Sequence, residues 1–170
     1  LNEGTTADGT QLVDPAALNA ALTPHMRSVE GSLIPPSITG RAGFYKHERE
    51  DLLLMRFAEG TTAAGVFTRH GVGSAPVDWC KKSLAASKGE DVRALVVNAG
   101  CANSFTGRPG ADAARRVASA VAKRFDCRQR DIMAASTGVI GVLLDDAKIT
   151  ARLPEVEARL TGDAWAAAAK

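Results

Sequence analysis

The sequence is poor in the residues that build metal centres and disulfide frameworks. Its 170 residues include three cysteines and three histidines. No two cysteines form a C-x-x-C pair, and no histidine stands at metal-ligand spacing from another histidine or a cysteine. Neither a disulfide framework nor a zinc site is therefore expected, and we predict no metal site.

An excess of one charge and a long apolar run are also missing. The 21 Lys and Arg residues nearly balance the 19 Asp and Glu residues, for a formal net charge of +2. This balance gives no indication of a nucleic-acid surface. No apolar run approaches the roughly 20 residues that cross a bilayer, and the first residues lack the pattern of a secretion signal. We expect a soluble, cytoplasmic protein that binds neither nucleic acid nor membranes.

Hydrophobic residues make up 45% of the chain, which is enough for the core of one domain. We expect strands at 52–57 and 63–68, joined by a hairpin turn at 59–62. Two further strands are expected at 92–98 and 131–135, and the apolar run of 92–98 predicts that this strand is buried on both faces. The expected helices are 111–125, 145–153, and a further helix that Pro154 opens and that continues to the end. Adjacent strands followed by strands separated by helices indicate an α/β layered fold. Residues 1–36, with four prolines, are predicted to be an N-terminal arm or extension before a domain at 37–170.

Two segments of small and polar residues directly follow predicted strands. They are "NAGCANSFTGRPG" at 98–110 and "ASTGVIG" at 135–141. Ligands of α/β proteins gather at such strand ends, so the two segments form a candidate pocket. The glycines match neither dinucleotide nor phosphate-loop spacing, which argues against nucleotide binding.

The hydroxyl of Thr137 and the N–H of Gly138 could donate together to one oxygen, as an oxyanion hole for acyl transfer does. The alternative is a tight turn in which the threonine bonds to local backbone. Around the first segment, Asn98 and Asn103 would fix the turn through backbone hydrogen bonds. Thr106 and Gly107 would close it beside Gly100. A complete site also needs a nucleophile with a base, and no G-x-S-x-G elbow occurs. Cys101 has no basic neighbour that would lower its pKa.

The order of three motifs resembles the bifunctional glutamate and ornithine N-acetyltransferase family of arginine biosynthesis. The motifs are "TTAAGVFTRHGVGSAPVDWC" (61–80), "ALVVNAGCANSFTGRPG" (94–110) and "ASTGVIG" (135–141). The resemblance implies a layered mixed-sheet fold of the self-cleaving, N-terminal nucleophile-like type. It also implies that the chain is the α-chain portion and that Thr137 and Gly138 are the oxyanion hole.

In that family an autocatalytic cleavage exposes a threonine nucleophile, which on this matching lies beyond Lys170. The threonine takes acetyl from N-acetylornithine and passes it to glutamate. The implied partners are the β chain of the same precursor and those two substrates, in an α2β2 heterotetramer or higher oligomer. No cofactor is implied, although bifunctional members also accept acetyl-CoA as a co-substrate. Alone, the chain is expected to be inactive and to expose apolar surface.

The sequence departs from the family at one motif and leaves two other functions open. The family usually has Asn-Ser-Gly-Asn-Ala-Asn where this chain has Asn98-Ala99-Gly100-Cys101-Ala102-Asn103. The first open function is a related self-cleaving, aminopeptidase-like amidohydrolase that passes the acyl group to water. The second is a non-catalytic binding or structural subunit. Arg69 and His70 are read either as contacts for a carboxylate substrate or as an exposed loop pair.

Overall fold

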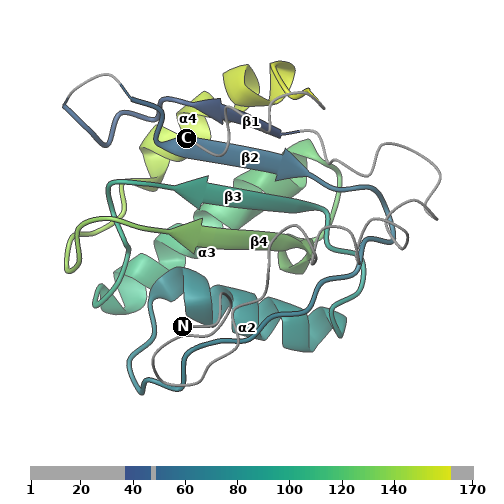
Figure 1. The fold of residues 1–170 in the computed structure, drawn as a ribbon, viewed down its shortest axis with the longest axis horizontal. Helices are drawn as coiled ribbons and strands as arrows, with labels where there is room; N and C mark the ends of the chain where they lie inside the picture. Colours follow the sequence, from purple (N-terminus) through teal and green to yellow (C-terminus); the bar gives the residue numbers. More distant parts are fainter. Residues whose placement is uncertain (1–36, 47–48, 162–170) are drawn as a thin grey trace, which may run out of the picture. The chain divides into compact units, whose positions relative to one another are not determined.

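A four-stranded mixed sheet organises the computed structural model, which describes residues 37–46 and 49–161. The arm predicted for 1–36 lies outside these residues. The strands lie in the order of the chain (Figure 1) and are β1 (Ser37–Gly40), β2 (Leu52–Arg56), β3 (Ala94–Asn98) and β4 (Ile132–Ser136). β1, β2 and β3 pair antiparallel, whereas β3 and β4 pair parallel.

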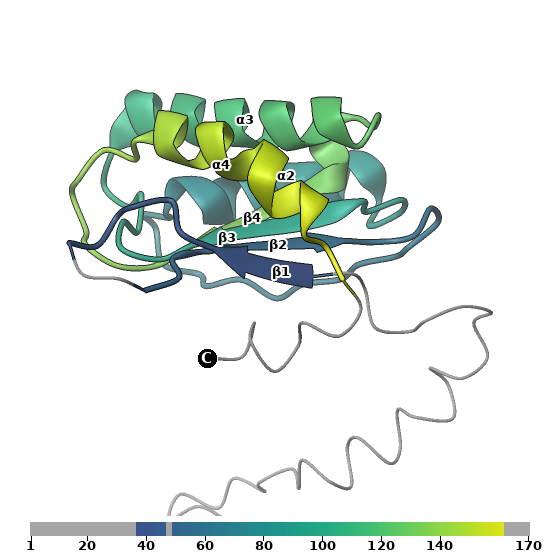
Figure 2. The ribbon, with the colours of Figure 1, turned by 90° about the horizontal axis from the view of Figure 1, so that it is seen from above.

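The three α-helices of the described part lie on the same face of the sheet (Figure 2). They are α2 (Ala75–Ser87), α3 (Gly107–Arg124) and α4 (Asp146–Ala158). The core forms where α3 and α4 face the sheet. On α3 the apolar residues recur at helical spacing and are buried, as predicted: Ala113, Ala114, Val117, Val121 and, just after the helix, Phe125. The predicted α/β layered fold is therefore confirmed.

The parallel pair sets where a site can form. Parallel strands need a crossover connection, and here α3 supplies it between β3 and β4. The carboxyl ends of both strands consequently meet at one edge of the sheet, with Asn98 directly opposite Ser136. The two glycine-rich segments begin at this edge.

The outer edge of β4 is covered by side chains of α2. The Trp79 indole N–H donates to the carbonyl of Ile132 at 2.8 Å, and the Cys80 thiol donates to the carbonyl of Ala134 at 3.1 Å. Burial raises the pKa of the Cys80 thiol, which keeps its proton available for this bond. Because these donors occupy the backbone of the edge, β4 is shielded from pairing with a further strand.

The strand expected at 63–68 is not formed, and the hairpin with 52–57 is absent. β2 already pairs with β1 on one side and β3 on the other, so it has no free edge for a third partner. The segment instead runs beside α2, where the Lys81 ammonium donates to the carbonyl of Thr68 at 3.2 Å. The same ammonium lies over the ring of Phe67.

Two further expectations need correction. Along β3, buried residues alternate with half-buried ones, so one face is fully covered rather than both. The helices expected on either side of Pro154 are one helix, α4. Pro154 is exposed, and the buried side chains of Leu153 and Val156 hold the helix against the sheet through this position. α4 ends at Ala158, so the predicted last helix does not continue through 159–161, and its remainder at 162–170 lies outside the described residues.

The helix α2 was not predicted from the sequence. Its charged residues are mixed with serine and alanine, and its apolar periodicity is weak. Within residues 37–46 and 49–161, no helix is long and apolar enough to span a bilayer.

Candidate functional site

Three loops meet at the carboxyl ends of β3 and β4, at the left of Figure 1. One loop precedes β2 (41–46), one follows β3 (99–106), and one follows β4 (137–145). The second and third contain the two glycine-rich segments.

Asn98 connects the ends of the two parallel strands. Its side-chain amide donates to the carbonyl of Cys101 at 2.9 Å, and its amide oxygen accepts the Ser136 hydroxyl at 2.6 Å. The backbone carbonyl of Asn98 accepts the N–H of Thr137 at 3.0 Å. Asn98 is buried, so these bonds form in a poorly solvated environment and define the direction in which the chain leaves β4.

Two glycines bring the backbones of the loops into direct contact. A Cβ at Gly138 would lie 2.3 Å from the carbonyl carbon of Gly100 and 2.7 Å from the backbone nitrogen of Cys101. Gly138 has φ of +124° and Gly100 has φ of +101°, conformations that other residues rarely adopt. Only glycine at position 138 therefore permits this approach without a shift of the backbone.

The exposed residues Thr137 and Gly138 present two donors without a protein partner. Within the described residues, neither the Thr137 hydroxyl nor the Gly138 N–H makes a hydrogen bond. The alternative turn, in which the threonine hydroxyl bonds to local backbone, is therefore not the arrangement seen. The loop beyond is fixed, because the N–H of Val139 donates to the carbonyl of Gly100 and the N–H of Ala102 donates to the carbonyl of Val139.

The remaining predicted residues of the first segment shape the beginning of α3. Asn103 is fully buried with φ of +48°, and its amide donates to the carbonyl of Gly110 at 3.0 Å. Its amide oxygen accepts the Thr106 hydroxyl at 2.8 Å. Gly107, with φ of +57°, is the first residue of the helix. These residues contact each other and α3, whereas Asn98 and Gly100 contact the loop that carries Gly138.

Sequence reasoning missed two residues of this arrangement. Ser136 lies within the segment 135–141 but was given no role, yet its hydroxyl donates to the amide oxygen of Asn98. Asp51 is buried, and its carboxylate accepts the backbone N–H groups of Ala42, Gly43 and Phe44.

Asp51 holds a segment that packs against Gly100. The bonds of its carboxylate place Phe44 so that its Cβ would lie 2.6 Å from a Cβ at Gly100. The only sequence signal was a carboxylate directly before a predicted strand, which is too common to indicate this role.

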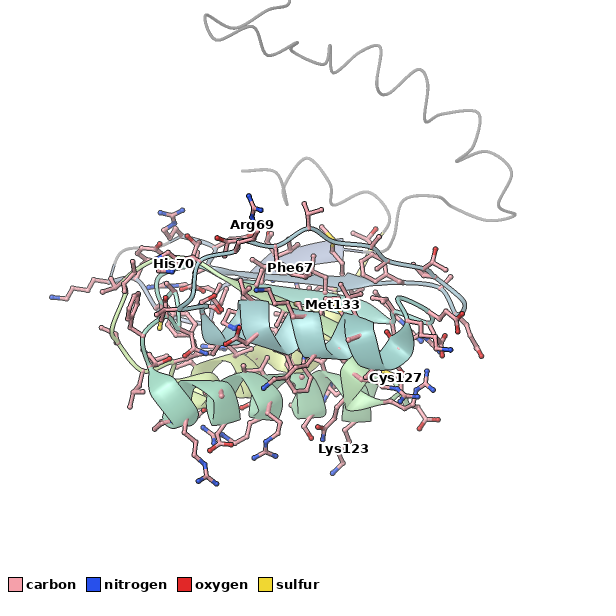
Figure 3. All side chains as sticks on the ribbon, turned by 90° about the horizontal axis from the view of Figure 1, so that it is seen from below. Phe67, Arg69, His70, Lys123, Cys127 and Met133 are labelled. Carbon is pink, nitrogen blue, oxygen red and sulfur yellow. The ribbon has the colours of Figure 1, made fainter. Side chains whose placement is uncertain are left out.

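Cys101 is bonded within the protein, and the potential metal-ligating side chains of the described residues are scattered. Cys101 is buried, and its thiol donates to the carbonyl of Val142 at 3.3 Å. No group of three potential metal-ligating side chains gathers anywhere in the described ranges. Arg69 and His70 are an exposed loop pair before α2 (Figure 3), and the His70 ring hydrogen bonds to the backbone of Val72.

Comparisons with known proteins match this fold and these segments. The model of the ArgJ family matches residues 37–170. The arginine biosynthesis bifunctional protein ArgJ of Caulobacter vibrioides is 85% identical over 132 residues, which are 78% of this chain and 33% of that protein. ArgJ of Gluconobacter oxydans is 46% identical over 129 residues, 76% of this chain and 30% of that protein.

The crystal structure of ornithine acetyltransferase from Mycobacterium tuberculosis, complexed with ornithine, superposes with a TM-score of 0.66 at 31% identity. The superposition covers 78% of this chain and 72% of the M. tuberculosis chain. ArgJ of Bacillus halodurans gives a TM-score of 0.65 at 29% identity over 74% of this chain and 63% of that one. The chain spans about a third of the length of the curated relatives that it matches. The motifs, the fold and the matched residues agree, and the chain belongs to the ArgJ family.

Proposed function

We propose that this chain is the α-chain portion of an ornithine acetyltransferase that moves acetyl from N-acetylornithine to glutamate. Thr137 and Gly138 form its oxyanion hole. The observation that carries the proposal is the pair of adjacent donors, a hydroxyl and a backbone N–H, that no described group of the protein satisfies. Such a pair can stabilise the negative oxygen of a tetrahedral intermediate.

The proposed reaction has two acyl-transfer steps. The hydroxyl of a threonine outside this chain attacks the acetyl carbonyl of N-acetylornithine, and its proton passes through a base to the departing ornithine amine. The product is an acetyl-threonine ester. The amine of glutamate then attacks the ester, and the threonine regains its proton. In both steps the carbonyl oxygen becomes negative, and it would lie about 3 Å from the Thr137 hydroxyl and the Gly138 N–H.

The contacts around Gly138 favour catalysis because they hold the donors before the substrate arrives. The close approach to Gly100 and the hydrogen bonds of Val139 fix the backbone from which the Gly138 N–H projects. The Asn98 carbonyl fixes the N–H of Thr137, so the side chain of Thr137 starts from a defined position. Donors held in this way need little reorganisation when charge develops.

The β chain of the same precursor would supply the nucleophile, in an α2β2 or higher oligomer. The transfer needs no cofactor, and acetyl-CoA would enter only as a second acetyl donor. The ornithine bound in the M. tuberculosis enzyme supports an amino-acid substrate for this family member too.

A test should separate the role of the hydroxyl from the integrity of the site. The complete polypeptide would be expressed unmodified and as Thr137→Ala and Thr137→Ser, and its cleavage would be followed by mass spectrometry. We expect all three to cleave, and we expect Thr137→Ala to lose roughly 10²–10³-fold in kcat, as removal of one oxyanion donor does. Thr137→Ser keeps a hydroxyl and should retain most of the activity.

Three results would contradict the proposal. Equal kcat in Thr137→Ala and the unmodified enzyme would show that the hydroxyl is not an oxyanion donor. Release of acetate without N-acetylglutamate would indicate the amidohydrolase instead. A polypeptide that neither cleaves nor transfers acetyl would indicate a binding or structural subunit.

A further inference from the structure

A groove opens between the segment that follows β1 and the helix α4. Its volume is about 460 Å³, and its charged and aromatic lining consists of Arg41, Tyr45, Glu50, Arg152, Glu155 and Arg159. Binding sites for small molecules typically have volumes of roughly 300–1,000 Å³. The groove therefore has the size of a ligand site, and the proposed acyl transfer gives no role to its guanidinium and carboxylate groups.

The two walls of the groove are fixed to each other. α4 lies over β1 (Figure 2), where a Cβ at Gly40 would lie 2.8 Å from Cγ2 of Val156. The Lys148 ammonium donates to the carbonyl of Gly43 at 3.1 Å and so joins α4 to the segment after β1. The buried carboxylate of Asp51 accepts the N–H of Gly43 and of both its neighbours. A ligand would consequently meet a preformed groove, which lowers the entropy that binding costs.

The charges of the lining are only partly balanced within the protein. The Arg152 guanidinium lies 3.1 Å from the Glu155 carboxylate, so these two charges compensate each other. The other charged groups of the lining are the guanidinium groups of Arg41 and Arg159 and the carboxylate of Glu50. Among the residues that the structure describes, the side chains of Arg159 and Glu50 make no hydrogen bond or ion pair. Beyond the internal pair, the groove thus offers two positive charges and one negative charge.

A molecule that complements these groups carries two carboxylates and one ammonium group. A guanidinium binds a carboxylate through two parallel N–H···O bonds, whereas a carboxylate such as that of Glu50 binds an ammonium group. A simple dicarboxylate would place negative charge beside Glu50, and a neutral amino acid would leave one guanidinium without an anion. The groove therefore matches the charges of an acidic α-amino acid.

Tyr45 lies between the groove and the candidate oxyanion hole. Its side chain lines the groove, and its Cε2 atom would lie 3.2 Å from a Cβ at Gly100. Gly100 in turn contacts Gly138 through its backbone. The Arg49 guanidinium lies over the Tyr45 ring, 4.5 Å from its centre, and adds positive charge near the groove. The groove is thus a neighbour of the two donors and a separate place for a ligand.

We propose that this groove binds a free acidic α-amino acid, with Arg41 and Arg159 contacting its two carboxylates and Glu50 its ammonium group. The inference goes beyond the proposed function, because acyl transfer at Thr137 and Gly138 does not require a ligand in the groove. It assigns to the chain a second site, in which an amino acid is bound by its charges and undergoes no reaction.

Hydrogen exchange followed by mass spectrometry tests this assignment in the complete polypeptide. L-Glutamate is the probe. L-Glutamine, which lacks the second carboxylate, and glutarate, which lacks the ammonium group, are the matched controls. We expect L-glutamate to slow exchange in peptides that cover 41–46 and 152–159, and either control to need an at least tenfold higher concentration for the same protection. This measurement locates the bound ligand and needs no turnover.

Two substitutions identify the groups that bind the ligand. Arg159→Gln should raise the L-glutamate concentration for half-maximal protection at least tenfold. Arg115→Gln is its control, because Arg115 is an exposed arginine of α3 outside the groove. Glu50→Gln removes the group that we expect to distinguish an amino acid from a dicarboxylate. The Glu50→Gln protein should therefore respond equally to L-glutamate and glutarate.

The proposal is overturned by any of three outcomes. The first is no protection of 41–46 and 152–159 by L-glutamate, and the second is equal protection of the unmodified protein by glutarate or L-glutamine. The third is equal protection of Arg159→Gln and Arg115→Gln. Acetyl transfer, assayed on the same unmodified sample, reports separately on the proposed function, because Thr137 and Gly138 lie outside the groove.

Discussion

Replacing Gly138 by alanine tests the contact on which the site is built. The new Cβ would lie 2.3 Å from the carbonyl carbon of Gly100 and 2.6 Å from its Cα, so one of the two backbones must move. Both neighbours are backbone atoms of a loop that is itself hydrogen-bonded, and no flexible side chain can yield. Forcing extra volume into a packed region costs about 1–3 kcal/mol. The φ of +124° adds about 1–3 kcal/mol of strain.

Gly141→Ala is the matched control for this experiment. Gly141 lies three residues further along the same loop and also has a positive φ, +80°, but a Cβ there meets nothing within 4 Å. Its substitution should cost only the backbone strain of about 1–2 kcal/mol. The difference between the two variants therefore contains the cost of the contact with Gly100, roughly 1–3 kcal/mol, together with the difference in backbone strain between φ of +124° and φ of +80°.

Thermal unfolding and amide hydrogen exchange would measure the outcome. We expect the melting temperature to fall from the unmodified protein to Gly141→Ala and further to Gly138→Ala. If the loop opens locally instead, the N–H groups of Val139 and Ala102 should exchange faster in Gly138→Ala. The reasoning is refuted if Gly138→Ala is as stable as Gly141→Ala and its amides remain equally protected.

Two other substitutions probe the supports of the site and of the helical layer. Asp51→Ala removes the acceptor of three N–H groups in the segment 42–44 and should lower the free energy of unfolding on the order of 3 kcal/mol, since bonds to charged groups contribute about 1.5–3 kcal/mol each. Urea unfolding would measure this loss of stability. Asp51→Asn keeps one acceptor oxygen, so its free energy of unfolding should fall less. Equal stability of Asp51→Ala and the unmodified protein would contradict the role of Asp51 as this acceptor. The hydrogen bonds from Arg116 lower the pKa of Asp146 from its ordinary value of 3.8, so the stability that this carboxylate adds is present above pH 3.8 and disappears as the pH falls through the lowered pKa. Asp146→Asn should therefore be less stable than the unmodified protein at pH 7, with the difference decreasing below pH 3.8, and a difference that does not change with pH in unfolding titrations would contradict this.

Local patterns predicted the elements that have strong periodicity or direct strand signals. The helix around Val117 and Val121, and the strands ending at Asn98 and Ser136, followed from spacing and apolar runs. The expected strand at 63–68 failed because strand formation needs a free neighbouring edge, and β2 has none. Edge availability depends on the whole sheet and is invisible in a local window.

The candidate site could be located from its sequence, but its supports could not. Small residues after a strand made Thr137 and Gly138 candidates, because a strand end with glycine leaves backbone groups free, and the family resemblance favoured an oxyanion hole over a tight turn. The contact between Gly138 and Gly100 joins positions 38 residues apart. The role of Asp51 depends on a loop that precedes it and packs against Gly100. Such contacts arise from tertiary structure, which no spacing rule encodes.

The parallel pairing of β3 and β4 has a consequence for the order of folding. The antiparallel strands β1 and β2 are close in sequence, whereas Asn98 and Ser136 meet only after the intervening chain, including α3, has closed. Closing a long connection costs entropy before any new contact compensates for it, so such pairings form late. The loop that presents Thr137 and Gly138 meets the loop after β3 at that same step. A partly folded chain therefore lacks the assembled candidate site, and the proposed ability to stabilise a negative oxygen would appear only when folding of this domain is nearly complete.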